Sequence, residues 1–151
     1  MNENSSHIRH MIEDDILKVY EIERKSFPYP FGEVLIHNIY FGAPELCFVI
    51  EYDQEIVGFL LGGYIPVEKQ THIFSIAILE NYRGMGFGKK ILLHFLERSS
   101  LLGYPNTKLE VSVDNAGAIK LYEEQGFEIV SRIRKYYQDN SDAFLMIRKT
   151  E

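Results

Sequence analysis

The sequence contains no tryptophan, a single cysteine and no long uninterrupted apolar run. Cys47 therefore cannot form an internal disulfide, and its apolar neighbours indicate a small core residue rather than a nucleophile. No segment approaches the roughly 20 apolar residues of a membrane-spanning helix, so no membrane partner is expected. Residues 1–15 are polar and lack the apolar stretch of a signal peptide, so a cytoplasmic location is expected.

Positive charge is also scarce. The chain has 16 Lys and Arg against 22 Asp and Glu, which gives a formal net charge of −6. Proteins that bind the phosphate backbone of nucleic acids need a basic face, so no nucleic-acid partner is expected. An acidic protein suits a cationic partner such as an amine.

No linker rich in Pro, Ser or Gly, no repeat and no low-complexity tract divides the chain. At 151 residues it has the length of about one domain, so we expect a single domain over residues 1–151. Ten Tyr and ten Phe provide ample volume for a core. The oligomeric state is expected to be a monomer or a weak homodimer.

The hydrophobic pattern alternates between the period of a strand and that of a helix. Strands are expected at residues 7–11, 45–52, 55–64, 71–79, 107–113, 127–137 and 143–148. Helices are expected at residues 13–26, 31–40 and 86–100. A fourth helix follows Asp114 or Asn115, either of which can cap it, and Gly126 can end it. This order predicts an α/β (α+β) fold, with a mixed, mostly antiparallel sheet of about seven strands flanked by four helices.

Period two assigns side chains to the faces of two strands. In the strand at 71–79, one face is expected to carry His72, Phe74, Ile76 and Ile78. The opposite face is expected to carry Ile73, Ser75, Ala77 and Leu79. In the strand at 107–113 it likewise separates two sets: Leu109, Val111 and Val113 against the polar Lys108, Glu110 and Ser112. Glu110 is thus expected on a polar face that can border a cleft.

A glycine-rich turn at residues 81–90 follows a predicted strand and opens a predicted helix. Glycines let the backbone approach an anion, and the first N–H groups of a helix have no intrahelical partner. The helix N-terminus adds partial positive charge, while Arg83, Lys89 and Lys90 add full charges. These features predict a site for a phosphate or a pyrophosphate.

Two common phosphate-binding patterns do not fit this turn. The nucleoside-triphosphate loop needs four residues between its glycines, whereas Gly84 and Gly88 are separated by three. The dinucleotide pattern G-x-G-x-x-G, begun at Gly84, meets Lys89 where its last glycine should stand. The pattern that fits is R-x-x-G-x-G, with Arg83, Gly86 and Gly88. It resembles the acetyl-CoA pyrophosphate loop of the GNAT acetyltransferases.

A second segment carries the same resemblance. After a predicted strand, residues 115–127 match N-x-x-A-x-x-L-Y-x-x-x-G-F with no position missing: Asn115, Ala118, Leu121, Tyr122, Gly126 and Phe127. A capped amphipathic helix that ends at glycine explains the same residues, and both interpretations can hold. The resemblance covers nearly the whole chain. It is strongest to the RimI-like branch of N-terminal protein acetyltransferases and its archaeal relatives, with further similar stretches at residues 26–29, 74–78, 132–137 and 142–143.

This resemblance implies transfer of the acetyl group of acetyl-CoA to the α-amine of a protein or peptide N-terminus, with a ribosomal protein among the candidate substrates. It implies Glu110 as the base and Tyr122 as the acid that protonates the coenzyme thiolate. His72 is expected to assist as a base or to line the cleft, and no metal is expected. The plain structural alternatives are a solvated carboxylate, a core aromatic and a structural histidine.

The resemblance also implies the binding residues. The coenzyme is expected at Ile76, Ala77, Ile78, Arg83, Gly84, Met85, Gly86, Phe87, Gly88, Lys89, Asn115 and Tyr122. The substrate slot is expected at Phe27, Tyr29, Tyr136 and Tyr137, although aromatics near a sheet opening are more often core residues.

Two other functions stay open at this point: acetylation of a small-molecule amine and non-catalytic binding of acetyl-CoA. The fold cannot separate them. The presence of both Glu110 and Tyr122 disfavours a non-catalytic module, and the stretch at 134–137 favours peptide N-termini. At pH 7 an α-amine is roughly several-hundred-fold richer in its neutral form than a lysine, so a modest base suffices.

Overall fold

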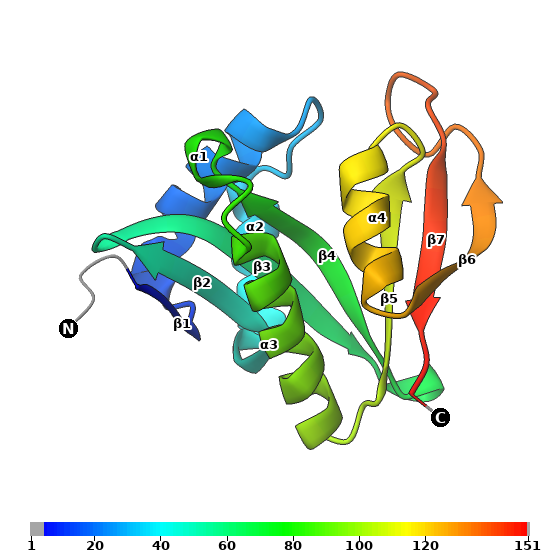
Figure 1. The fold of residues 1–151 in the computed structure, drawn as a ribbon, viewed down its shortest axis with the longest axis horizontal. Helices are drawn as coiled ribbons and strands as arrows, with labels where there is room; N and C mark the ends of the chain where they lie inside the picture. Colours follow the sequence, from blue (N-terminus) through cyan, green and yellow to red (C-terminus); the bar gives the residue numbers. More distant parts are fainter. Residues whose placement is uncertain (1–4, 151) are drawn as a thin grey trace.

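The computed structural model describes residues 5–150. These residues form seven strands and four α-helices (Figure 1). The strands are β1 (Ser6–His10), β2 (Cys47–Tyr52), β3 (Glu55–Ile65), β4 (Gln70–Ile78), β5 (Asn106–Ser112), β6 (Phe127–Ile133) and β7 (Ala143–Arg148). The helices are α1 (Ile16–Ser26), α2 (Glu33–Gly42), α3 (Phe87–Leu101) and α4 (Ala116–Glu124). Among the described residues, no helix is long and apolar enough to cross a membrane.

The strands form one sheet in the order β1-β2-β3-β4-β5-β7-β6. Only β4 and β5 are parallel, and α3 connects them, whereas every other neighbouring pair is antiparallel. The expected hairpin between β2 and β3 is confirmed: Asp53 and Gln54 both have positive φ, which suits a two-residue turn. The predicted mixed, mostly antiparallel sheet is therefore confirmed.

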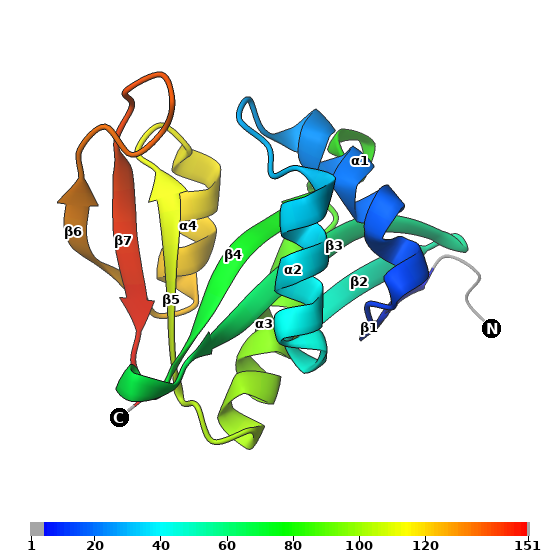
Figure 2. The ribbon, with the colours of Figure 1, turned by 180° about the vertical axis from the view of Figure 1, so that it is seen from behind.

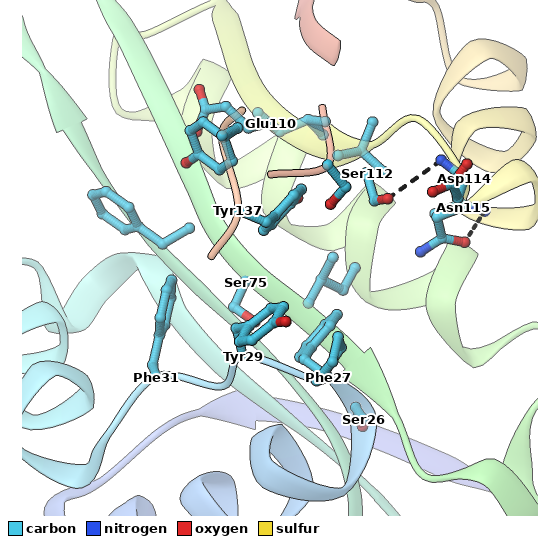
Figure 3. Close-up of a pocket in the computed structure, with 18 of the residues that line it drawn as sticks. Ser26, Phe27, Tyr29, Phe31, Ser75, Glu110, Ser112, Asp114, Asn115 and Tyr137 are labelled. Atoms are coloured by element: carbon cyan, nitrogen blue, oxygen red, sulfur yellow. Dashed lines mark hydrogen bonds between the residues drawn. The ribbon is translucent and has the colours of Figure 1, made fainter. Parts of the chain in front are cut away.

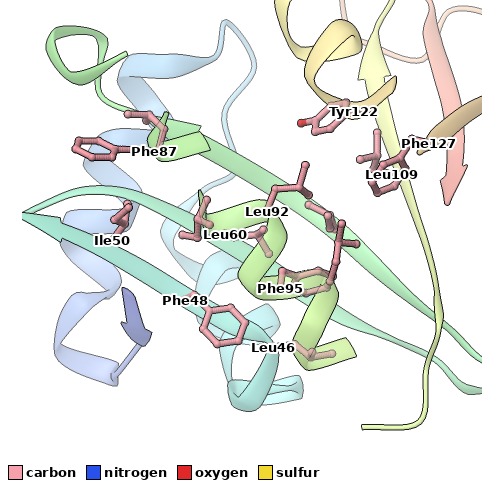
Figure 4. Packing of buried hydrophobic residues seen from close by; sticks show 14 of the residues in the cluster. Leu46, Phe48, Ile50, Leu60, Phe87, Leu92, Phe95, Leu109, Tyr122 and Phe127 are labelled. Atoms are coloured by element: carbon pink, nitrogen blue, oxygen red, sulfur yellow. The ribbon is translucent and has the colours of Figure 1, made fainter. Parts of the chain in front are cut away.

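Helices cover both faces of the sheet. α3 and α4 lie on one face and α1 and α2 on the other, as the two opposite views show (Figures 1 and 2). The core on the α3 side joins Phe48 and Leu60 of the sheet to Leu92 and Phe95 of the helix (Figure 4). A Cβ atom at Gly62 would lie 2.4 Å from the Phe95 ring, so glycine permits this close packing. Each buried side chain of this size stabilises the fold by about 1.5–3 kcal/mol.

Most predicted element boundaries agree with the structure to within two residues, but four details were wrong or left open. The predicted strand at 127–137 ends at Ile133. The predicted helix at 13–26 begins as a separate 3-10 turn, Glu13–Asp15, and the predicted strand at 45–52 begins in the 3-10 turn Pro44–Leu46. The cap of α4 is Asn115, whose Oδ1 accepts a hydrogen bond from the Ala118 N–H at 3.2 Å.

Candidate active site

A cleft opens where β4 and β5 separate. The two strands pair only from Gln70↔Asn106 to Ile73↔Leu109 and then diverge (Figures 1 and 2). The bend coincides with a β-bulge: Leu61 of β3 pairs with Ser75 and Gly62 pairs with Ile73, which leaves Phe74 as an extra residue in β4. The space between the diverging strands has a volume of ≈ 560 Å³.

The bulge overturns the predicted faces of β4. Ile73 packs with Ile76 and Ile78 on the α3 side, whereas Ala77 belongs to the core on the α1 side. The prediction had placed Ile73 on the same face as Ala77. An inserted residue shifts the alternation by one, so every side chain beyond it changes face. For β5 the prediction is confirmed, because Leu109 and Val111 are buried on the α3 side.

Two aromatic segments border the cleft on opposite sides. The turn after α1 contributes Phe27, Tyr29 and Phe31, and the connection between β6 and β7 contributes Tyr136 and Tyr137 (Figure 3). The carboxylates that line the cleft are Glu23, Glu110, Asp114 and Asp139. Within residues 5–150 no lysine or arginine lines it, so the cleft is acidic.

Glu110 extends from β5 into this cleft and is paired with His72 of β4. The Nε2 atom of His72 lies 2.8 Å from Oε1 of Glu110, and both side chains are largely buried. His72 itself does not line the cleft. Of the two, Glu110 is therefore the residue that faces the cleft, and His72 contacts its carboxylate from outside the lining.

Tyr122 lines the cleft from α4 and is 6% exposed. Burial raises the pKa of its hydroxyl, and the nearby Tyr137 raises it further. In Figure 4 the hydroxyl points away from the Phe127 ring, which packs against the Tyr122 ring at 5.7 Å. A tyrosine with a raised pKa stays protonated at neutral pH, so Tyr122 has a proton to donate.

The glycine-rich turn adopts the conformation that an anion site needs. Gly84 and Gly86 have φ of 80° and 83°, and a Cβ atom at either would meet no atom within 4 Å. The first helical hydrogen bond of α3 runs from the Lys90 N–H to the Gly86 carbonyl. The N–H groups of residues 87–89 precede it and are free to bind an anion.

The charges around this turn differ from the prediction. The Nζ atom of Lys90 donates to the Ser6 carbonyl of β1 at 2.9 Å, so its charge is engaged with β1. Arg83 Nε donates to the Ile78 carbonyl at 2.9 Å, which ties the turn to the end of β4. Lys89 and Met85 are exposed, and the Phe87 side chain is buried in the core, so Phe87 offers only its backbone.

Residues 16–127 match the model of the acetyltransferase (GNAT) family. The chain belongs to this family. It is 33% identical to an N-alpha-acetyltransferase of Sulfurisphaera tokodaii, over 87% of this chain and 86% of the relative. It is 28% identical to the ribosomal protein bS18-alanine N-acetyltransferase of Escherichia coli, over 87% and 89%. The crystal structure of Ard1 from Thermoplasma volcanium superposes with a TM-score of 0.91 at 31% identity, covering 97% of this chain and 99% of that one.

As a GNAT acetyltransferase, the chain uses acetyl-CoA as its acetyl donor. The turn at residues 83–89 fits the diphosphate of this donor, since it combines unpaired N–H groups, open space beside two glycines and the charge of Arg83. Ile76 lines the cleft, and the edge of β4 beyond Ile73 has no pairing with β5. Asn115 lines the cleft too, and its cap bond uses only Oδ1, so its amide N–H groups stay available.

Arg83 lines a second hollow, together with residues 25, 26 and 79–82. Ser26 borders both hollows, so they adjoin at the end of α1. The predicted coenzyme residues are therefore divided between the cleft and this turn.

Glu23 is a cleft residue of this acetyltransferase that the motifs did not reveal. It is 2% exposed, and its carboxylate accepts hydrogen bonds from Ser75 Oγ at 2.5 Å and from the Phe31 N–H at 2.9 Å. Burial raises its pKa. Glu23 thus joins the aromatic turn to β4. Its position seven residues after Ile16, on the apolar face of α1, was the signal that could have identified it.

Proposed function

We propose that this chain transfers the acetyl group of acetyl-CoA to the α-amino group of protein or peptide N-termini, as a RimI-like N-alpha-acetyltransferase. The observation that carries the proposal is Glu110, held by His72 at 2.8 Å, at the end of an acidic cleft that two aromatic segments border. The name of the Sulfurisphaera relative supports the same substrate class.

In the proposed reaction, the neutral amine attacks the thioester carbonyl and a C–N bond replaces the C–S bond. Glu110 accepts the proton that the amine loses, and His72 positions the carboxylate for this step. Tyr122 donates its proton to the departing sulfur, so the products are an amide and a thiol. Tyr122 lines the cleft, and its hydroxyl is protonated before the step.

We propose that the donor's diphosphate binds the backbone of residues 83–89 and that its arm follows Ile76, Ala77 and Ile78. The unpaired strand edge supports this placement, since a linear amide-containing arm can add to it like a strand. Asn115 contributes its side-chain amide. The residue contacts of the peptide are proposed at Phe27, Tyr29, Tyr136 and Tyr137, all of which line the cleft.

The acidic lining supports a cationic acceptor, because carboxylates raise the local concentration of a positively charged peptide end. We propose a ribosomal protein as one candidate substrate, since the Escherichia coli relative is named for such a protein. A cytoplasmic location and a monomer or weak homodimer are part of the same proposal.

The test uses matched pairs of synthetic peptides. Each pair has the same sequence with an internal lysine, and one member has a free N-terminus while the other has a blocked one. We expect mass spectrometry to find one acetyl group on the N-terminus of the free peptides and none on the blocked peptides. Acetylation of the blocked peptides alone, at lysine, would overturn the proposal.

A further inference from the structure

The connection between β6 and β7, residues 134–142, is called the tyrosine loop here. It begins and ends where Ile133 pairs with Ala143. Tyr136 and Tyr137 project from it into the cleft, with ring centroids 4.9 Å apart and nearly perpendicular planes. Burial raises the pKa of both hydroxyls, and the proximity of Glu110 raises them further. The loop is thus part of the wall above Glu110.

The tip of the tyrosine loop, residues 137–141, makes its hydrogen bonds mainly within itself. The Tyr137 N–H donates to the Ser141 carbonyl at 3.2 Å, and the Asn140 N–H donates to the Tyr137 carbonyl at 2.9 Å. Asp139 Oδ1 accepts from both the N–H and the hydroxyl of Ser141. These bonds give the tip a shape, but they do not fix its position over the cleft.

Asp142 bonds the tyrosine loop to the sheet and also closes the base of the loop. Its Oδ2 accepts from Arg132 Nε on β6 at 2.7 Å, and its Oδ1 accepts from the Lys135 N–H at 2.9 Å. Its carbonyl accepts from the Val113 N–H at 3.2 Å, directly after β5. Asp142 therefore links the tyrosine loop to β6 and to the strand that carries Glu110.

The bond to Lys135 has a particular consequence. Lys135 has φ of 54°, in the left-handed region where a residue other than glycine is strained and persists only if its surroundings hold it. This turn immediately precedes Tyr136. The Asp142 carboxylate accepts the N–H of the strained residue, so it stabilises the backbone that directs both tyrosines.

We propose that Asp142 is a positioning residue for the peptide. Its carboxylate fixes the position of Tyr136 and Tyr137 relative to Glu110, although Asp142 does not itself line the cleft. This inference rests on the proposed function, in which those tyrosines contact the acceptor peptide. Loss of the carboxylate then weakens binding of the peptide while the donor site and the chemical groups stay in place.

The experiment measures steady-state kinetics of Asp142→Ala. The substrate is the peptide with a free N-terminus that the wild type acetylates fastest among the matched pairs. We expect the KM for the peptide to rise about tenfold, with kcat and the KM for acetyl-CoA changed less than about twofold. Asp142→Asn retains an oxygen for the Lys135 N–H, so its peptide KM should stay within about threefold of the wild type. Glu128→Ala, an exposed carboxylate of β6, is the matched control and should change neither KM.

An unchanged peptide KM in Asp142→Ala, or an equal rise in the KM for acetyl-CoA, would overturn the inference. If Asp142→Ala does not fold, Arg132→Met decides: it removes the Nε donor, and with it one of the two side-chain bonds of Asp142, and should raise the peptide KM about threefold. No change there overturns the inference as well. A wild-type protein that acetylates no free N-terminus overturns the proposed function and this inference together, whereas failure of the inference alone leaves wild-type activity intact.

Discussion

Glu110 and Tyr122 have different surroundings, and these surroundings suit opposite proton-transfer roles. Glu110 borders the cleft, and its Oε1 lies 2.8 Å from Nε2 of His72, which positions it to accept a proton from a bound amine. Tyr122 is enclosed by core residues, and burial raises its pKa, so it stays a proton donor. These surroundings support the proposed roles of Glu110 as the base and Tyr122 as the acid.

The double variant Glu110→Gln, Tyr122→Phe tests these roles. It preserves both shapes but removes the proton acceptor and the donor, so kcat should fall by about 100-fold or more. Isothermal calorimetry should give a Kd for acetyl-CoA within about threefold of the wild type, because the turn that is proposed to hold the diphosphate is untouched. The control is Tyr104→Phe. The Tyr104 ring packs against Tyr64 away from the cleft, so this variant should keep full turnover. Unchanged kcat in the double variant would remove both residues from the mechanism.

Glu23 leads to a prediction about stability and pH. Its folded-state pKa is raised by burial, so the folded protein binds this proton more tightly than the unfolded chain does. The stabilisation that protonated Glu23 provides is fully present below the pKa that Glu23 has in the unfolded chain. It is lost as the pH rises through the pKa that Glu23 has in the folded protein. In urea unfolding, the stability of Glu23→Gln relative to the wild type should increase as the pH rises above about 4.5, by at most about 1.4 kcal/mol per pH unit. A stability difference that is constant across this range would contradict the assignment.

At the scale of elements, the best predictions came from patterns that are local in the sequence. The α4 helix has its cap at Asn115, and a glycine of positive φ, Gly126, follows its end, as the motif indicates. The turn before α3 has its glycines in the left-handed conformation. Capping and turn geometry depend on a few neighbouring residues, so the sequence alone contains this information.

The turn before α3 gives a prediction with a built-in control. Gly86→Ala and Gly103→Ala both force a Cβ onto a positive φ where no other atom is within 4 Å, so each should cost roughly 1–2 kcal/mol of stability. Only Gly86 borders the proposed diphosphate site. Its variant should raise the KM for acetyl-CoA about tenfold or more, while the Gly103 variant leaves this KM unchanged. Equal kinetics for the two variants would mean that the turn does not hold the donor.

The wrong predictions share a physical cause, which is dependence on distant partners. The extra residue at Phe74 is visible only from the pairing with β3, so period two assigned the wrong face to Ile73. The sequence pattern predicts one continuous strand at 127–137. In the structure the chain turns after Ile133, where the Lys135 N–H donates to the Asp142 carboxylate. The contact of Lys90 with Ser6 of β1 likewise depends on a distant segment, and the sequence around Lys90 does not report it.

At the scale of the whole molecule, the site exists because two parallel strands separate. Residues from α1, β4, β5, α4 and the tyrosine loop meet at this opening, and no local pattern in the sequence reports that they do. The resemblance to a family supplied this arrangement in advance, through the two motifs at residues 83–88 and 115–127. That residues 1–151 form a single domain stays a prediction, as does the oligomeric state.

The separation of β4 and β5 is also the basis of the central claim: the opening holds acetyl-CoA so that its thioester meets Glu110 and Tyr122. The most direct test is a crystal structure of the protein with coenzyme A. We predict density for the diphosphate on the amides of residues 87–89, and the sulfur in the cleft between Glu110 and Tyr122. Coenzyme A bound elsewhere, with the turn at Gly86 closed by its own side chains, would contradict the account.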